Sequence, residues 1–186
     1  MQSFAQTPLD LLRNKFSQGA VSMTAEYVMT LQQMPVTGTS EVLLQGDRYQ
    51  MKSNGLEVFC DGESVWTVDE SSMEVVIEPC DAVSESYAAN PVLLLAELDE
   101  FFDIQSQKHN GDKTEYTLTA IKDCGVSLSQ LTLTSDGHVV SGRFTLADGT
   151  VVSVKVTSMK KAEERPASFF SPSHKFGPDW VVTDLR

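Results

Sequence analysis

Basic residues are scarce in this chain, and their scarcity limits the partners it can bind. The 186 residues include 14 lysines and arginines against 26 aspartates and glutamates, which gives a formal net charge of −12. A surface of this charge repels phosphate backbones and anionic lipid headgroups, and no compact basic stretch offsets it. We therefore expect neither nucleic acid nor a peripheral membrane surface among the partners.

Long apolar runs and recognisable leader segments are also missing. No run approaches the ~20 residues that a helix needs to span a bilayer. Residues 1–5, MQSFA, have neither the charged nor the apolar region of a signal peptide. The protein is therefore expected either to be cytosolic or to start after a removed signal peptide.

Cysteine occurs three times, at Cys60, Cys80 and Cys124. Three cysteines cannot form a disulfide framework, although one pair with a spare thiol is possible. None lies in a CxxC motif or at metal-ligand spacing from a histidine. The sequence predicts buried free thiols or one structural disulfide, and neither a metal site nor a cofactor.

Motifs of catalysis are absent as well. The three histidines, His109, His138 and His174, are far apart and fall in no HxxxH or HxH pattern. Residues 62–66, GESVW, lack the second glycine of the GxSxG nucleophile elbow, and neither a Walker A sequence nor GxGxxG occurs. We therefore predict that the protein is not an enzyme.

What is present suits one folded domain. Hydrophobic residues make up 41% of the chain, which is long enough to bury a core without disulfides or metals. No internal repeat, low-complexity tract or linker divides it. We expect a single, monomeric domain over residues 1–186.

The chain opens with a helix pattern. Thr7 is a good N-cap, Pro8 suits the first helical position, and Asp10 completes a variant of the capping box. Apolar residues at helical spacing and a terminating glycine follow, namely Leu9, Leu12, Phe16 and Gly19. This pattern predicts a short amphipathic helix.

Beyond this helix the hydrophobic period changes to two. Apolar and polar residues alternate from Val21 to Leu31, with Val28 as the exception, which predicts a long half-buried strand. Five dipeptides suited to tight hairpins follow: Asn54-Gly55, Asp61-Gly62, Asn110-Gly111, Asp136-Gly137 and Asp148-Gly149. Because parallel strands need long crossovers, these turns predict an antiparallel meander.

Further strands are expected in two sets and at the end of the chain. They are Glu41–Leu44, Arg48–Met51, Leu56–Cys60, Ser64–Val68, Met73–Glu78, Ile104–Gln107, Thr114–Ala120, Leu128–Thr134, Val139–Leu146, Val151–Thr157 and a strand near Trp180–Leu185. The charged segment Met159–Arg165 is interpreted as an exposed connection. We predict an α+β fold, mainly antiparallel, with about 10–11 strands in one curved sheet.

One stretch interrupts the strands. Asn90 and Pro91 form a helix start, and Val92–Leu98 is apolar nearly all round, so this short helix should be buried. We expect it, with the N-terminal helix, to cover the apolar concave face of the sheet.

The apolar side of the sheet is the most informative feature. If the strand phases are right, its inward residues include Met23, Tyr27, Met29, Tyr49, Met51, Trp66 and Met73. Methionine is favoured where a surface must adapt to varied apolar partners, although the same residues also suit an ordinary core. Val92, Leu94 and Leu95 fit either a core plug or a movable lid.

Four motifs, in order along the chain, resemble those of LolA- and LolB-type lipoprotein carriers. Residues 61–69, DGESVWTVD, resemble the family's DGxxLWxYxP hairpin, and residues 73–79, MEVVIEP, its next strand. Residues 90–95, NPVLLL, resemble the NPxxLL lid helix, and FFSP at 169–172 with WVVTDLR at 180–186 resembles the C-terminal end.

This resemblance implies an unclosed antiparallel β-barrel with helices over its opening and an apolar cavity inside. It further implies a soluble periplasmic carrier without cofactor. Such a carrier accepts acylated lipoproteins from an inner-membrane transporter and passes them to an outer-membrane acceptor. The ligand-binding residues would be Met23, Tyr27, Met29, Tyr49, Met51, Trp66, Val92, Leu94 and Leu95.

The chain departs from the family at one point. The pattern WxKRPxxFxW is replaced by residues 43–51, LLQGDRYQM, so that the Arg-Pro position falls on Gly46-Asp47. The family arginine's lid-holding role is therefore not transferred to Arg48. Two hypotheses stay open: a lipoprotein or lipid carrier, and a lipid- or protein-sensing module for envelope stress on the same scaffold.

Overall fold

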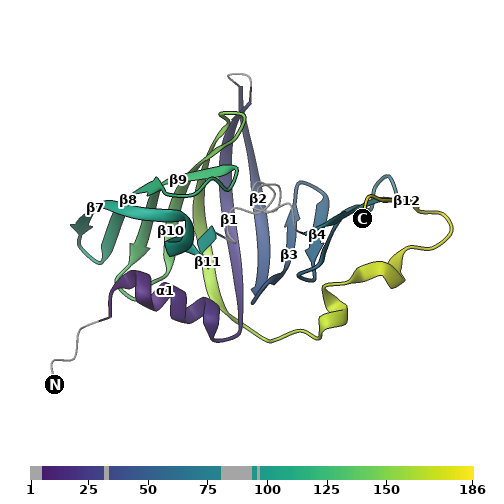
Figure 1. Ribbon diagram of the computed structural model, residues 1–186, viewed down its shortest axis with the longest axis horizontal. Coiled ribbons are helices and arrows are strands. Elements are labelled where there is room, and N and C mark those ends of the chain that lie inside the picture. Colours follow the sequence, from purple (N-terminus) through teal and green to yellow (C-terminus); the bar gives the residue numbers. More distant parts are fainter. Residues whose placement is uncertain (1–5, 32–33, 81–93, 96) are drawn as a thin grey trace.

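The computed structural model describes residues 6–31, 34–80, 94–95 and 97–186 (Figure 1). Twelve strands form one sheet in the order β12-β6-β5-β4-β3-β2-β1-β11-β10-β9-β8-β7. Their bounds are β1 Ala20–Leu31, β2 Met34–Gln45, β3 Arg48–Ser53, β4 Leu56–Cys60, β5 Ser64–Asp69, β6 Glu74–Pro79, β7 Phe102–Asn110, β8 Lys113–Ala120, β9 Val126–Thr134, β10 Val139–Leu146, β11 Val151–Ala162 and β12 Val181–Asp184.

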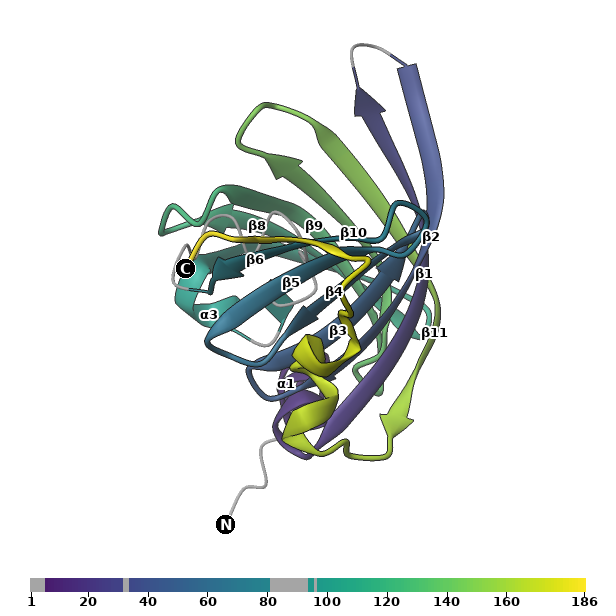
Figure 2. The ribbon, with the colours of Figure 1, turned by 90° about the vertical axis from the view of Figure 1, so that its right-hand side faces the viewer.

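The sheet is an unclosed, curved structure, as Figure 2 shows from the side. Its long central strand β1 pairs with β2 and β11, and one antiparallel meander leads outward from each. The last strand, β12, returns to pair in parallel with β6 at one edge. The predicted fold class is confirmed, with twelve strands among the described residues rather than about 10–11.

Two strand boundaries differ from the predictions for one reason. β2 begins at Met34 rather than near Glu41, and β11 continues to Ala162 through most of the supposed connection. Both pair with β1 over its length, with Leu31 opposite Met34 and Ala20 opposite Ala162. The partner strand therefore extends segments whose own sequence lacks clear alternation.

Tight turns join the antiparallel strands where the dipeptides predict them. Asn54 and Gly55, between β3 and β4, have φ angles of 50° and 82°, as a type I′ turn requires. Asp61-Gly62, Asn110-Gly111, Asp136-Gly137 and Asp148-Gly149 lie at the other predicted hairpins.

The N-terminal helix α1 (Pro8–Ser17) is confirmed together with its cap. The Asp10 amide donates to Thr7 Oγ1 at 3.2 Å, and the Thr7 amide donates to Asp10 Oδ2 at 2.9 Å. The three apolar residues of its stripe, Leu9, Leu12 and Phe16, are buried against the concave face. A second helix, α3 (Leu98–Phe101), is short and buries both of its terminal residues.

The predicted lid helix is only partly within the described residues. Residues 94–95 form a 3₁₀ turn, and α3 begins at Leu98, where the predicted helix was expected to end. Val92 lies outside the described residues. The lid segment as described is therefore a turn followed by one short helix.

The sheet buries apolar side chains on both faces. The larger cluster lies on the concave face, under α1, α3 and residues 94–95. A smaller one, formed by Phe59, Trp66, Val68, Val75 and Ile77, lies on the convex face against Phe176 and Trp180. Figure 2 shows the C-terminal segment with its 3₁₀ turns η2 (Ala167–Phe169) and η3 (Pro172–Lys175) crossing this outer side.

Candidate ligand-binding cavity

An apolar cavity of about 170 Å³ lies on the concave face of the sheet. It is partly open, and its walls come from the central strands β1–β3 and β9–β11. The residues are Met23, Ala25, Tyr27, Met29, Ser40, Val42, Met51, Ser53, Leu131, Val139, Gly142, Phe144, Leu146, Val152, Val154 and Val156, with Leu95 added from the 3₁₀ turn. No charged side chain lines it within the described part of the chain.

The alternation of β1 creates one wall of this cavity. Met23, Ala25, Tyr27 and Met29 occupy every second position of the strand, so their side chains project from the same face. Across the strands, Tyr27 lies opposite Gly38 of β2. Because Gly38 has no side chain, the Tyr27 ring can lie against its backbone, where a Cβ would collide with the ring.

The cavity has a small polar end. The Tyr27 hydroxyl lies 3.1 Å from Ser53 Oγ and accepts a hydrogen bond from Asn54 Nδ2. Ser53 Oγ also lies within 3.3 Å of the Thr39 carbonyl. The Tyr27 and Ser53 hydroxyls therefore already have partners within the protein, and apart from Ser40 the remaining wall is apolar.

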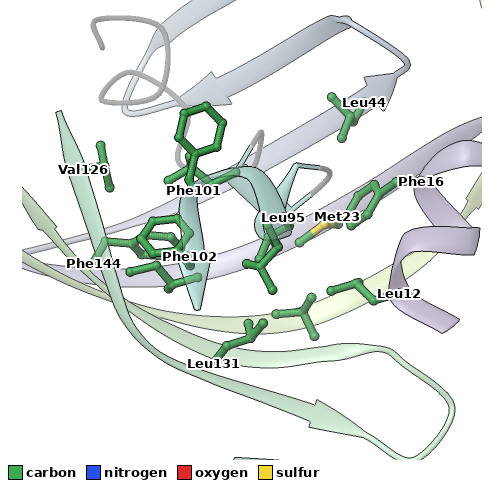
Figure 3. Packing of buried hydrophobic residues seen from close by; sticks show 14 of the residues in the cluster. Leu12, Phe16, Met23, Leu44, Leu95, Phe101, Phe102, Val126, Leu131 and Phe144 are labelled. Atoms are coloured by element: carbon green, nitrogen blue, oxygen red, sulfur yellow. The ribbon is translucent and has the colours of Figure 1, made fainter. Parts of the chain in front are cut away.

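Leu95 closes one side of the cavity. Figure 3 shows its side chain directed toward Met23 and Leu131, with Phe102 and Phe144 farther along the same apolar layer. Leu94, Leu98 and Phe101 of the same segment are also buried. Arg13 of α1 pairs with Asp99 of α3, so the two helices over the concave face are also joined by charge.

The predicted ligand-binding residues separate into four groups. Met23, Tyr27, Met29, Met51 and Leu95 line the cavity. Tyr49 and Leu94 belong to the same apolar cluster but not to the cavity wall. Val92 lies outside the described residues, and Trp66 forms the fourth group.

Trp66 lies on the opposite face of the sheet from the cavity. It packs in the convex cluster with Phe59 and Ile77, while its neighbour Val65 belongs to the concave cluster. A one-residue error in strand phase moves a side chain to the other face, and both faces of β5 are buried here. Alternation alone therefore could not assign Trp66 to a face. Met73, also expected inward, is exposed at a turn.

Sequence reasoning missed the wall formed by β9–β11. Val152, Val154 and Val156 alternate along β11, and Val139 and Phe144 face the same space from β10. The alternation was visible in the sequence, but only the sheet order places β11 next to β1, with β10 and β9 following it.

Arg48 faces away from the cavity. On β3 it alternates with Tyr49 and Met51, whose side chains belong to the concave cluster. Among the described residues, Nε of its half-buried side chain has no hydrogen-bond partner. Arg48 is thus not placed to hold the described part of the lid segment, Leu94, Leu95 and α3.

The described residues form a largely apolar cavity whose wall carries no charged side chain. They contain no group of three or more histidine, cysteine or acidic side chains that could hold a metal. His138 pairs with Asp136 at 2.8 Å in a hairpin turn, and His109 contacts Thr114 at 3.0 Å. A dry cavity of about 150 Å³ lined by apolar groups can hold a benzene-sized molecule, so this one suits a hydrocarbon fragment.

No helix within the described ranges is long and apolar enough to cross a membrane.

Comparison with known proteins identifies a family. The family model described as "Outer membrane lipoprotein carrier protein LolA" matches residues 48–173, more than half of the chain. No match was found among the curated proteins.

Solved structures that share the fold include the following two. An uncharacterized conserved protein from Thermus thermophilus is 11% identical with a TM-score of 0.58, over 95% of this chain and 96% of that one. A LolA superfamily protein from Nitrosomonas europaea is 14% identical with a TM-score of 0.50, over 89% and 98%.

Proposed function

The chain belongs to the LolA family of outer membrane lipoprotein carriers, and from this premise we propose that it carries acylated lipoproteins without catalysing a reaction. In this proposal it works in the periplasm as a monomer. An inner-membrane transporter supplies the lipoprotein and an outer-membrane acceptor receives it. The single observation that carries the proposal is the apolar cavity between β1–β3, β9–β11 and Leu95.

An apolar cavity is useful to a carrier because an acyl chain is much less stable in water than in an apolar environment. An acyl chain of about fifteen methylenes gains on the order of 12 kcal/mol on leaving water, at ~0.8 kcal/mol per methylene. An exposed acyl chain would therefore stay in its membrane rather than cross an aqueous space. An apolar cavity lowers this barrier by replacing water around the hydrocarbon.

The size of the cavity sets a condition on binding. Pockets that enclose drug-sized ligands measure ~300–1,000 Å³, whereas this one measures about 170 Å³. A whole acyl chain therefore enters only if the Leu95 side moves outward. Moving Leu95 breaks its apolar contacts with the cavity wall. This cost offsets part of the free energy gained when the acyl chain leaves water, which favours later release of the cargo.

A titration with a fluorescent triacylated lipopeptide tests the binding. We expect saturable, near one-to-one binding that is competed by unlabelled acyl lipid. Ser40→Trp should weaken it at least tenfold, because Ser40 lines the cavity and a tryptophan would fill it. Thr39→Trp is the matched control, since the neighbouring side chain points to the other face of β2 and should leave binding unchanged. Failure of the folded protein to bind would contradict the proposal.

The second candidate, a lipid- or protein-sensing module, is favoured by the orientation of Arg48 away from the lid side. A carrier should release bound lipopeptide to an outer-membrane acceptor, whereas a sensor should retain it in a stable complex with a partner. Release from the loaded protein, measured by loss of probe signal after acceptor addition, separates the two.

A further inference from the structure

Two of the three cysteines lie side by side on the concave side of the sheet. Cys60 is the last residue of β4, and Cys80 directly follows β6. Their sulfur atoms are 3.4 Å apart. The Cys60 side chain is fully buried, whereas Cys80 is half-buried and packs against the same apolar cluster.

The backbone already holds both cysteines in position. The Cys80 amide donates to the Glu63 carbonyl at 2.8 Å, which fixes it beside the β4–β5 turn. Within that turn, Asp61 Oδ1 accepts from the amides of Glu63 and Ser64 at 3.0 and 2.9 Å. The Gly62 amide points at Cys60 Sγ from 3.4 Å.

We propose that Cys60 and Cys80 form a disulfide bond when the protein meets a disulfide-bearing oxidant, either a small-molecule disulfide or an oxidising protein disulfide. A disulfide measures about 2.05 Å between sulfurs, so the two atoms need to approach by little more than 1 Å, which side-chain rotation supplies. This assigns a modification site on the side of the sheet away from β9–β11.

Cys124 is the spare thiol. It is buried just before β9, and its sulfur donates to the Val126 carbonyl at 3.1 Å. In the sheet order, β9 is separated from β4 by β3, β2, β1, β11 and β10. Cys124 therefore does not compete for either partner.

The reaction proceeds by two thiol–disulfide exchanges. The more accessible Cys80, as thiolate, attacks one sulfur of the oxidant and expels its other half as a thiolate. Cys60, as thiolate, then attacks the Cys80 sulfur of this mixed disulfide and expels the second half. In total the two cysteines lose two protons and two electrons, and the oxidant's disulfide is reduced to two thiols.

The second exchange requires the thiolate of the buried Cys60. Burial raises the pKa of the Cys60 thiol to about 12, with the Gly62 amide opposing the shift. The attacking thiolate is therefore rare at neutral pH, and closure of the bond should accelerate as the pH rises from 7 to 9.

The bond would tie the end of β4 to the end of β6 and enclose β5 between them. Closing the loop from Cys60 to Cys80 restricts the unfolded chain and should raise the melting temperature by roughly 5–10 °C. The protein would then be more stable in an oxidising compartment than in a reducing one.

The experiment equilibrates the reduced protein with oxidised glutathione and maps its peptides by mass spectrometry without reduction. We expect a Cys60–Cys80 cross-linked peptide with two hydrogens lost, one maleimide-reactive thiol after unfolding, and the higher melting temperature. Cys80→Ser should abolish the cross-link and the shift in melting temperature, while Cys124→Ala should retain both.

Three results would overturn the proposal. They are three free thiols after equilibration, a stable glutathione adduct on Cys80 alone, or a cross-link that includes Cys124. Because Cys80→Ser changes a half-buried side chain, its fold is checked by circular dichroism in the reduced state, where it should match the unchanged protein. None of these readouts depends on acyl binding.

Discussion

At the scale of single residues, glycines decide how closely the elements approach one another. Gly38 leaves room for the Tyr27 ring at the polar end of the cavity. Gly137, in the β9–β10 turn, has a φ of +78° and lies directly under α1. A Cβ added there would meet Leu11 Cβ and the Leu12 amide nitrogen at 2.7 Å. Gly137 thus sets the position of α1 on the concave face.

Gly137→Ala should destabilise the protein by about 2–4 kcal/mol, because it combines backbone strain with a clash against α1. Gly149→Ala is the matched control. Gly149 has a φ of +83° in the next hairpin, but an added Cβ would meet nothing within 4 Å. It should cost only about 1 kcal/mol of backbone strain. If urea unfolding showed that Gly137→Ala and Gly149→Ala lose the same free energy of unfolding, this role for Gly137 would be contradicted.

At the scale of elements, the segment from Leu94 to Phe102 joins the lid side to the sheet. Figure 3 shows Leu95 and Phe102 on one side of this segment and Phe101 on the other, and all three side chains are buried. Its charged contact, from Asp99 to Arg13 of α1, is largely exposed and so contributes little. Apolar burial therefore holds this segment, and an apolar ligand can compete for the same surface.

Leu95→Ala should lower the stability of the free protein by about 2–5 kcal/mol and tighten lipopeptide binding several-fold. The side chain that a ligand must displace would then be smaller, and the cavity larger. Leu133→Ala serves as the control, since Leu133 is equally buried in the concave cluster but does not line the cavity. It should lose similar stability without tighter binding. Weaker binding by Leu95→Ala would mean that Leu95 contacts the ligand rather than blocking it.

Sequence patterns anticipated most of the individual elements. The cap at Thr7, the period of two from Val21 and the glycine turns were all visible because each depends on local backbone preferences. The full length of β2 and β11 was not visible, since pairing with β1 extends them. The predicted start of the lid helix, at Asn90-Pro91, lies outside the described residues, and within them Leu94 and Leu95 form a 3₁₀ turn ahead of α3.

At the scale of the whole molecule, exposed aspartates accept hydrogen bonds in several turns, at the cap of α1 and near the C-terminus. The pKa of Asp184 is lowered to about 2, mainly by its hydrogen bond from Arg186, whose guanidinium also donates to Ser64 at 3.2 Å. The pKa values of other turn or cap aspartates, namely Asp10, Asp69, Asp136 and Asp148, are also lowered, mainly by local hydrogen bonds.

These shifts predict acid sensitivity. Each folded-state pKa lies below its unfolded value of ~3.9. At a pH between these two values the unfolded chain binds more protons than the folded protein, so the free energy of unfolding rises with pH. The contribution is fully present above about pH 5 and is lost as the pH falls toward 2. The urea midpoint should therefore drop between pH 5 and pH 3.

Asp184→Asn should reduce this drop, since it removes the carboxylate whose pKa is lowered to about 2 while Arg186 keeps a neutral acceptor. Glu26→Gln is a control, because its contact with Lys155 is long, at 3.7 Å, and exposed. A urea midpoint that does not change between pH 5 and pH 3 would contradict the prediction.

The sequence by itself determined the antiparallel class, the N-terminal helix, the turns and the family, because these depend on local propensity and on motifs contiguous in the chain. Only the tertiary structure decided which face each side chain occupies where both faces are buried, as at Trp66. It also paired β11 with β1, so that β9–β11 complete the cavity, and placed Cys60 beside Cys80. These outcomes depend on strand order and register, which are set by contacts between residues far apart in the chain.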